Sequence, residues 1–289
     1  MPARRTLGQA LKYLCSGLVG RIGTAKKCPS CGSGAARVID RKSFHTLNAC
    51  LECHLLYRYP SETPGAMAEF YANDYREPGL TTDLPDGGAL QWLIDTAFVG
   101  SSKDFTKNVD ILRALSLGPG ARLLEYGANW GYATWQFRSA GFEVSAFEIA
   151  PRRAQFGERL GVEIHTRLDR VGTEFDAVYS SHVLEHVPDP AGVLRQQLAL
   201  VKKGGLIACH TPNGSRSYRE RHKEAFHHLW GQVHPVLLTD DFVVSLARLR
   251  PFLITSDDEP AEIRSWNPTS QDLRDTSGPG LFFVIRQNE

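Results

Sequence analysis

The sequence of 289 residues has no apolar run of the roughly 18–20 residues that would span a bilayer. Its longest apolar strings, such as Phe242 to Leu246, end at a charge or a proline within a few residues. Charged residues make up 22% and hydrophobic residues 42% of the chain, which excludes a disordered, collagen-like or coiled-coil protein. We therefore expect a globular, cytoplasmic protein without a transmembrane segment, long enough for two domains.

The chain as a whole also lacks an excess of charge of one sign, because its formal net charge is +1. The charges are unevenly divided, however. Residues 1–60 hold ten Lys or Arg against Asp40 and Glu52, a local charge of +8, and the remaining 229 residues carry 23 bases and 30 acids, a local charge of −7. The basic segment favours contact with an anion, such as a phosphate, a nucleic acid or a membrane surface, although a solvated basic face explains it equally well.

The N-terminal segment lacks the pattern of a secretory signal. Lys12 interrupts its apolar stretch, and no small-residue cleavage site follows Leu14 to Gly20. Four leucines instead recur at helical spacing, at Leu7, Leu11, Leu14 and Leu18. Residues 1–27 are therefore predicted to form a basic amphipathic helix that docks on the protein, with a membrane surface as the alternative.

Four of the six cysteines form two pairs, Cys28-Pro-Ser-Cys31 and Cys50-Leu-Glu-Cys53, separated by 18 residues. This spacing is typical of a structural zinc site, because each C-x-x-C turn directs two thiolates at one point. Disulfides would need an oxidising compartment, and a redox-active pair would need a thioredoxin-like neighbour that the sequence lacks. Residues 28–60 are predicted to form a zinc ribbon whose closed site supports the fold, whereas Cys15 and Cys209 are expected to be buried thiols.

The rest of the chain is predicted to fold as a helical connector followed by an α/β domain. Residues 61–118 combine turn signals with helical periodicity at 66–75 and 105–115. Short apolar strands then alternate with helices, the strands at 121–126, 143–148, 162–166, 175–180 and 206–211 and the helices at 131–140, 151–160 and 190–202. Such alternation predicts a doubly wound, mostly parallel sheet in residues 119–289.

A glycine-containing loop lies between the first predicted strand and helix of this domain, where open parallel sheets bind ligands. Its sequence is Leu124-Glu125-Tyr126-Gly127-Ala128-Asn129-Trp130-Gly131. The two glycines allow a sharp turn and a close approach of the backbone to a ligand. Glu148 ends the next strand about twenty residues later, where a ribose diol would bind. The G-x-G-x-x-G spacing of dinucleotide-binding dehydrogenases is missing.

This loop resembles the first motif of the class I S-adenosylmethionine-dependent methyltransferases, an acidic residue followed by G-x-G-x-G. The resemblance covers the chain from about residue 105 onwards, and the segments His182 to Pro190 and Leu200 to Leu206 look like the branch of the family that acts on small molecules. Asn129 stands where the motif has its middle glycine, and asparagine tolerates left-handed conformations. Residues 119–289 are thus identified as a member of this family.

The resemblance implies that S-adenosylmethionine is the cofactor. It places Glu125 and Gly127 beside the methionine part of the cofactor and the ribose hydroxyls on Glu148. Residues near Leu168 and Ser181 would border the adenosine. The cofactor-binding residues expected on this basis are Glu125, Gly127, Ala128, Asn129, Gly131, Glu148, Ile149, Leu168 and Ser181.

The segment His182-Val183-Leu184-Glu185-His186 also fits the H-x-x-E-H pattern of inverted zinc proteases. Those histidines need an uninterrupted helix, whereas this segment leaves a strand and meets Pro188 and Pro190 within a few residues. The methyltransferase resemblance explains the segment without a protease.

Motifs for methylating nitrogen or carbon are missing. The chain has neither the Asn/Asp-Pro-Pro-aromatic motif of enzymes that methylate ring-bound amino groups nor the Pro-Cys dipeptide usual in carbon-5 pyrimidine methylation. We therefore expect O-methylation, which needs a base. The candidate catalytic bases are His186, after the strand end nearest the cofactor, and His234, in a stretch that resembles the family's histidine-containing segment. A purely structural role is the alternative for each.

A basic insertion follows the last predicted strand, where acceptors usually enter in this family, and contains Arg216, Arg219, Arg221, His222 and Lys223. With the basic N-terminus it favours a small or saccharide-type acceptor that bears a phosphate, such as a nucleotide sugar or a polysaccharide. Two alternatives stay open, a zinc-knuckle RNA methyltransferase and a non-catalytic, cofactor-binding partner protein. Few aromatic residues are interleaved with the N-terminal bases to stack on RNA.

Overall fold

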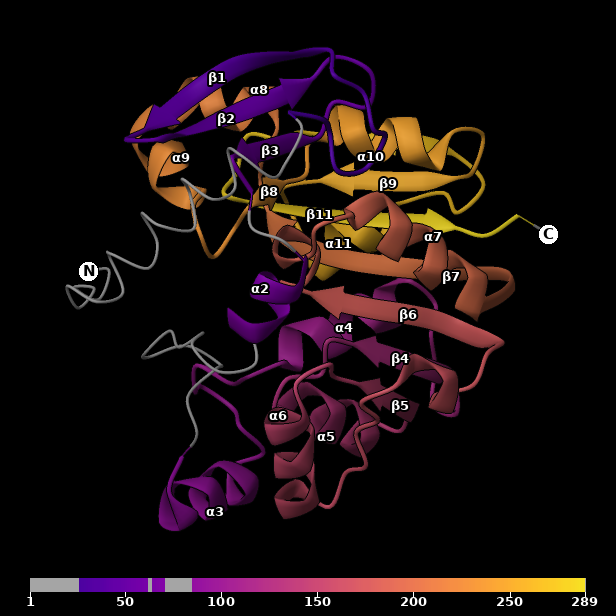
Figure 1. Cartoon of the computed structure of the whole chain (residues 1–289). Coiled ribbons are helices and arrows are strands. Elements are labelled where there is room, and N and C mark those ends of the chain that lie inside the picture. Colours follow the sequence, from indigo (N-terminus) through magenta and orange to yellow (C-terminus); the bar gives the residue numbers. More distant parts are fainter. Residues whose placement is uncertain (1–25, 62–63, 71–84, 289) are drawn as a thin grey trace.

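The computed structural model describes residues 26–61, 64–70 and 85–288, whose strands form two sheets (Figure 1). The larger sheet has the strand order β10-β9-β11-β7-β6-β4-β5, and the smaller has the order β1-β2-β3-β8. The helix predicted at 1–27 lies outside the described residues except for its last two positions. None of the described helices is long and apolar enough to cross a membrane.

The centre of the larger sheet confirms the predicted α/β alternation. Its parallel strands are β4 (Arg122–Tyr126), β5 (Glu143–Phe147), β6 (Phe175–Ser181) and β7 (Val201–Pro212). The helices between them are α5 (Tyr132–Ser139), α6 (Pro151–Phe156), which continues as the 3-10 turn η2 (Gly157–Leu160), and α7 (Pro190–Leu200). Pro151 and Pro190 both stand in the first helical turn, where a missing N–H costs nothing.

The prediction of a strand at 162–166 is wrong. Within this segment only His165 forms a bridge, to Phe147 at the end of β5. The chain turns at Gly161, which has a φ of 66°, and Val162 and Ile164 then pack towards Gly131 rather than joining the ladder. The apolar pattern of this segment therefore reflects packing on the helical layer.

The C-terminal part completes the larger sheet with strands for which the sequence analysis made no prediction. β11 (Gly280–Arg286) runs antiparallel between β7 and β9 (Phe252–Thr255), and β10 (Gln271–Leu273) lies parallel to β9 at the edge. The helices in this part are α10 (Asp240–Ala247) and α11 (Pro260–Arg264).

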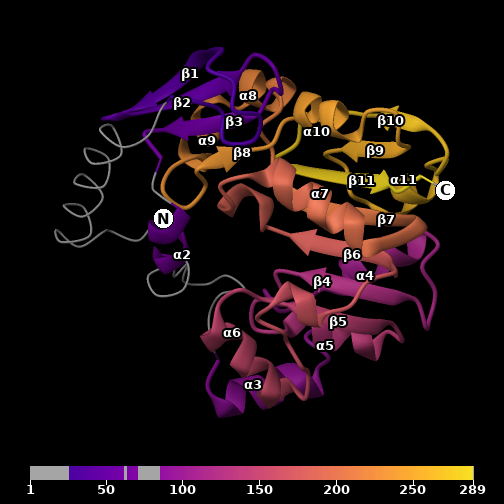
Figure 2. The same cartoon turned by 45° about the vertical axis from the view of Figure 1, so that its right-hand side comes forward.

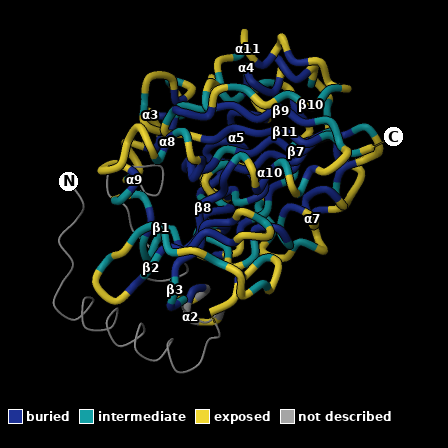
Figure 3. The backbone as a smooth tube through the Cα atoms, turned by 90° about the horizontal axis from the view of Figure 1, so that it is seen from above, coloured by how far each residue is buried: buried dark blue, intermediate teal, exposed yellow. Residues whose placement is uncertain are grey.

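Helices cover both faces of the larger sheet (Figures 1 and 2). Successive residues of a strand point to opposite faces of the sheet and enter different cores. In β4 and β6, Leu124 and Val178 join the apolar cluster that includes residues of α7 and α10. Their neighbours Leu123 and Tyr179 join the cluster that includes residues of α4 (Thr106–Ala114), α5 and α11. Figure 3 shows long buried stretches of backbone along β7 and β11 in the middle of the same sheet. Burial on both sides explains why the strands are apolar without alternation.

Helices precede the larger sheet, as the sequence predicts for the connector. α2 (Pro64–Glu69) overlaps the start of the predicted 66–75 helix, of which 71–75 lies outside the described residues, and α4 matches the prediction at 105–115. α3 (Gly87–Asp95) was not predicted, because its first residues look like a turn. Its N-terminus is capped by Asp86, whose Oδ1 accepts a hydrogen bond from the Ala89 N–H at 2.8 Å.

The small sheet joins the N-terminal ribbon to a late segment of the chain. β1 (Ala36–Lys42), β2 (His45–Cys50) and β3 (Leu56–Tyr59) are antiparallel, and β8 (Val236–Leu237) pairs with β3. Helices α8 (Arg216–Arg221) and α9 (Lys223–Leu229) pack on this sheet through a shared apolar cluster that includes Leu47, Phe226 and Trp230. The ribbon is therefore held by the insertion that follows β7.

Candidate active site

A cavity of about 1400 Å³ lies at the carboxyl ends of β4, β5 and β6. It is lined by nine of the eleven predicted catalytic and cofactor-binding residues: Glu125, Gly127, Ala128, Asn129, Glu148, Ile149, Ser181, His186 and His234. Two predicted residues do not line it. Gly131 lies behind the loop against Val162, and Leu168 packs on the apolar core.

The glycine loop has the left-handed backbone that its sequence suggests. Gly127 and Gly131 have φ values of 87° and 85°, and Asn129 has a φ of 52°. A Cβ built on Gly127 would lie 2.3 Å from Cγ2 of Val183, so glycine is required by space as well as by conformation. The side-chain Oδ1 of Asn129 is buried without a hydrogen-bond donor among the described residues. Asn129, which lines the cavity, thus carries one buried and unused acceptor.

Two buried carboxyl groups support this loop. Glu148 accepts hydrogen bonds from the backbone N–H groups of Asn129 at 3.0 Å and Ala150 at 2.9 Å, so it ties the end of β5 to the loop. Burial raises the pKa of Glu148, against these hydrogen bonds and the charge of Arg153. Burial also raises the pKa of Glu125 to about 8, although the Thr134 hydroxyl donates to it. The surroundings of Glu125 therefore favour the protonated carboxyl group.

The two predicted histidines lie side by side in the cavity, with ring centroids 5.0 Å apart. Nδ1 of His186 donates to the Val233 carbonyl at 2.8 Å, and Nδ1 of His234 donates to the Leu229 carbonyl at 2.7 Å. A carbonyl oxygen only accepts, so the proton of each neutral ring sits on Nδ1 and Nε2 carries the lone pair. Both rings are thus held in the tautomer that a base acting through Nε2 needs.

A buried acid accompanies these histidines. Glu185 has one carboxylate oxygen 3.0 Å from Nδ1 of His182 and 3.8 Å from Nε2 of His186, while the Thr211 hydroxyl donates to the other. Burial alone would raise the pKa of Glu185, but the neighbouring histidines, His186 above all, hold it at about 2. Burial lowers the pKa of His186, against the attraction of Glu185. The protonation states of the two groups are therefore linked, because a charge on either one favours the opposite charge on the other.

The protease pattern in this segment lacks the structure it requires. Leu184–His186 forms a single 3-10 turn, η4, between β6 and α7. The long helix that places two histidines on one zinc ion is not formed, as the prolines predict.

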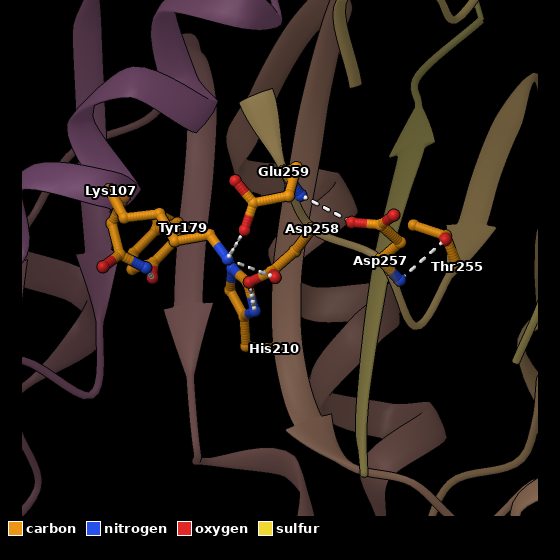
Figure 4. A network of polar contacts seen from close by, with 8 residues as sticks. Lys107, Tyr179, His210, Thr255, Asp257, Asp258 and Glu259 are labelled. Atoms are coloured by element: carbon orange, nitrogen blue, oxygen red, sulfur yellow. Dashed lines mark hydrogen bonds and ion pairs between the residues drawn. The ribbon is translucent and has the colours of Figure 1, made fainter. Parts of the chain in front are cut away.

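A second wall of the cavity comes from residues that the sequence analysis did not assign (Figure 4). Lys107, from α4, forms ion pairs with Asp258 at 2.7 Å and Glu259 at 2.8 Å. Asp258 also lies 3.5 Å from Nδ1 of His210, whose Nε2 is buried without a partner in the described part of the chain. Burial lowers the pKa of His210 to about 4, although Asp258 opposes this.

A sequence signal existed for His210 but not for Asp258. His210 stands near the carboxyl end of the strand predicted at 206–211, which is the edge where ligands bind. Asp258 follows β9, a strand that the sequence did not reveal.

The four paired cysteines converge, as predicted. The Sγ atoms of Cys28 and Cys53, and those of Cys31 and Cys50, are 3.5 Å apart, and all four lie within 4.8 Å of one another. These separations are too long for disulfide bonds. Cys209 is fully buried between strands, as expected, and Cys15 lies outside the described residues.

Comparison with known proteins agrees with this architecture. Residues 102–238 match a family described as a methyltransferase domain. The ubiquinone biosynthesis O-methyltransferase of Xanthomonas campestris pv. campestris is 31% identical over 116 residues, 36% of this chain and 48% of the relative. That of Xanthomonas oryzae pv. oryzae is 32% identical over 105 residues, 32% and 44% of the two chains. The chain spans about half the length of the curated relatives it matches.

A solved structure of the plantazolicin methyltransferase BamL, with a triazolic desmethylPZN analog and SAH, has the same fold. It is 11% identical, the similarity covers 77% of this chain and 94% of that chain, and the TM-score is 0.51. The family match at residues 102–238 includes the glycine loop and the strands that present it. Residues 102–238 therefore match a methyltransferase domain in sequence, and the chain shares its fold with a solved methyltransferase structure.

Proposed function

We propose that the chain transfers a methyl group from S-adenosylmethionine to an oxygen atom of a small or saccharide-type acceptor that bears a phosphate or another anionic group. The observation that carries the proposal is a shared cavity, because the cofactor loop at Gly127 and the histidines His186 and His234 line the same space. O-methylation requires a methyl donor and a base to meet at one hydroxyl group.

The residues of the cavity fit the cofactor. Gly127 and Asn129 both line the cavity, and Oδ1 of Asn129 is a buried acceptor that lacks a donor in the described chain. Each oxygen of Glu148 receives one backbone N–H and keeps a second acceptor site, which suits a pair of ribose hydroxyls. When bound, the cofactor supplies an electrophilic methyl group on a sulfonium.

His186 is the preferred base. Its Nε2 takes the proton of the acceptor hydroxyl as the new oxygen–carbon bond forms and the sulfur–carbon bond breaks. The ionised Glu185, 3.8 Å from that nitrogen, stabilises the imidazolium that results. Burial lowers the pKa of His186, which favours the unprotonated ring before the reaction. His234 is the alternative base, since its ring is oriented in the same way.

The nature of the acceptor rests on weaker observations. The curated relatives are named as O-methyltransferases, which supports oxygen as the methylated atom. Helices α8 and α9 carry Arg216, Arg219 and Lys223, which line one cavity, and the last residue of α9 accepts a hydrogen bond from His234. These cations support an anionic acceptor.

In this proposal Cys28, Cys31, Cys50 and Cys53 hold one zinc ion that supports the ribbon. Four sulfurs at ~2.3 Å from zinc lie roughly 3.8 Å apart in a tetrahedron, so the observed separations need only a small adjustment. The Arg58 N–H donates to the Pro235 carbonyl at 2.8 Å, next to His234. The zinc ribbon would therefore also hold the histidine segment in place.

A methyl-transfer assay tests the proposal. Labelled S-adenosylmethionine is offered with phosphorylated saccharides and nucleotide sugars in one arm and RNA in another, and we expect label in the saccharide arm. His186→Asn or His234→Asn should lower turnover by about 10²- to 10⁴-fold with the affinity for S-adenosylhomocysteine unchanged. His228→Asn is the matched control, because His228 is exposed and does not line the cavity.

The other outcomes separate the alternatives. Label in RNA would show that the acceptor is RNA and not a saccharide, as expected for a zinc-knuckle RNA methyltransferase. Cofactor binding without label in either arm would favour the non-catalytic partner protein. Near-native turnover of the double histidine variant would refute histidine as the base.

A further inference from the structure

A second cavity, of about 480 Å³, lies where β1 of the ribbon meets helices α8 and α9. We call it the seam cavity, because its walls come from the ribbon and from the insertion after β7, which pack together in Figures 1 and 2. Its cationic side chains are Arg37, Arg216, Arg219 and Lys223, and Ile39 and Phe226 give it an apolar part. It borders the active site through α9, whose last residue lines the larger cavity.

The two acids that line the seam cavity are already occupied. Asp40 accepts hydrogen bonds from Nδ1 of His227 and Nε1 of Trp230, both at 2.8 Å. Glu220 accepts from Nε of Arg216 at 2.6 Å. In the described part of the chain, no ion pair or side-chain hydrogen bond reaches the remaining three cations, which are Arg37, Arg219 and Lys223.

Arg219 is the most constrained of these three. Its guanidinium lies over the ring of Phe226, 5.8 Å from the centroid, and its Nε is buried without a hydrogen-bond partner. Burial and the nearby charge of Arg37 lower the pKa of Arg219. An unpaired buried donor and facing like charges both oppose folding unless an anion completes the arrangement.

We propose that the seam cavity binds the phosphate or diphosphate group of a small molecule through Arg37, Arg219 and Lys223. The four cations of the cavity exceed its two acids by two charges, which matches the double negative charge of a phosphate monoester or a diphosphate diester. The planar guanidinium suits two phosphate oxygens at once. The cavity is larger than an anion needs and falls within the range of small-molecule pockets, so the rest of the ligand would lie against Ile39 and Phe226.

This inference rests on the proposed function only where it concerns which molecule carries the phosphate group. The phosphate belongs either to the methyl acceptor or to a separate ligand that joins the ribbon to the insertion. Binding can be measured without methyl transfer, so failure of this site and failure of the proposed function are distinguishable.

Calorimetry of the full, zinc-loaded chain with inorganic pyrophosphate at about 50 mM salt tests the site. We expect one saturable site per chain. Arg37→Gln, at an exposed strand position, should weaken binding by at least about fivefold, and Arg37→Gln with Lys223→Gln by more than about twentyfold. Arg219→Lys, which keeps the charge but loses the planar fork, should also weaken it. The matched control is Arg41→Gln, an exposed arginine of the same strand outside the cavity.

Three results would overturn the inference: no saturable heat with pyrophosphate, an equal loss in Arg41→Gln, or tight binding of an RNA stem that pyrophosphate does not displace. Kinetics with the identified acceptor then assign the source. If the acceptor provides the phosphate, pyrophosphate competes with it and Arg37→Gln raises KM with kcat unchanged. If pyrophosphate binds without competing, the phosphate belongs to a separate ligand.

Discussion

Substitution of Gly127 by alanine is the sharpest test of the cofactor loop. Alanine at a φ of 87° costs about 1–2 kcal/mol, because the left-handed region crowds its Cβ against the backbone. That Cβ would also lie 2.3 Å from Cγ2 of Val183, and overpacking of this kind typically costs about 1–3 kcal/mol. We expect Gly127→Ala to lower the free energy of unfolding by about 2–5 kcal/mol and to weaken binding of S-adenosylhomocysteine.

Two further variants separate the two contributions. Gly172→Ala adds a Cβ at nearly the same φ, 84°, but in open space, and should therefore show the conformational cost alone. Val183→Ala in the Gly127→Ala background removes the colliding methyl groups and should recover the steric part, about 1–3 kcal/mol. Urea denaturation measures the free energies of unfolding, and calorimetry measures cofactor affinity. The reasoning is refuted if Gly127→Ala costs no more than Gly172→Ala, or if Val183→Ala recovers nothing in the double variant.

The remaining predictions concern the cofactor acid, the cysteine site and two histidines. Glu148→Ala should weaken S-adenosylhomocysteine binding at least about tenfold, since it loses charge-assisted hydrogen bonds worth roughly 1.5–3 kcal/mol each, and unchanged affinity by calorimetry would exclude the ribose assignment. Metal analysis should find one zinc per chain, and stripping it with a chelator should lower Tm; an unaltered melt of metal-free protein would contradict the supporting role. Because the base must be unprotonated and burial lowers the pKa of His186, kcat should rise with pH through a midpoint below the ordinary value of ~6.5 and then level off, whereas a flat profile would argue against this base. Burial lowers the pKa of His210 to about 4, so the folded protein is most stable above the pKa that this histidine has in the unfolded chain, and it loses that stability as the pH falls towards 4. In His210→Asn, the loss of unfolding free energy in acid, measured by urea denaturation, should be smaller by up to about 3 kcal/mol. An unchanged pH dependence of the unfolding free energy would refute this role of His210.

The sequence revealed most of the elements whose signal is local. The strands β4 to β7 are short apolar runs bounded by turn residues, and the prolines at the starts of α6 and α7 mark helix N-termini. Local patterns gave a wrong prediction at 162–166, where an apolar run packs on helices instead of joining the sheet. They also missed α3, because the glycines at its capped start look like a turn. A run of apolar side chains indicates that a segment is buried but does not indicate which neighbouring element packs against it.

The sequence by itself determined the glycine loop, the acid at Glu148 and the paired cysteines, because in each case the chemistry depends on residue types at a fixed short spacing. Only the tertiary structure decided which groups meet across long stretches of chain. It brought His234 beside His186, Asp258 and Lys107 to His210, and β8 onto the ribbon strand β3. These contacts depend on how helices and strands pack on one sheet. No local pattern carries that information, because the free energy that selects one partner among several apolar or charged segments belongs to the packed core as a whole.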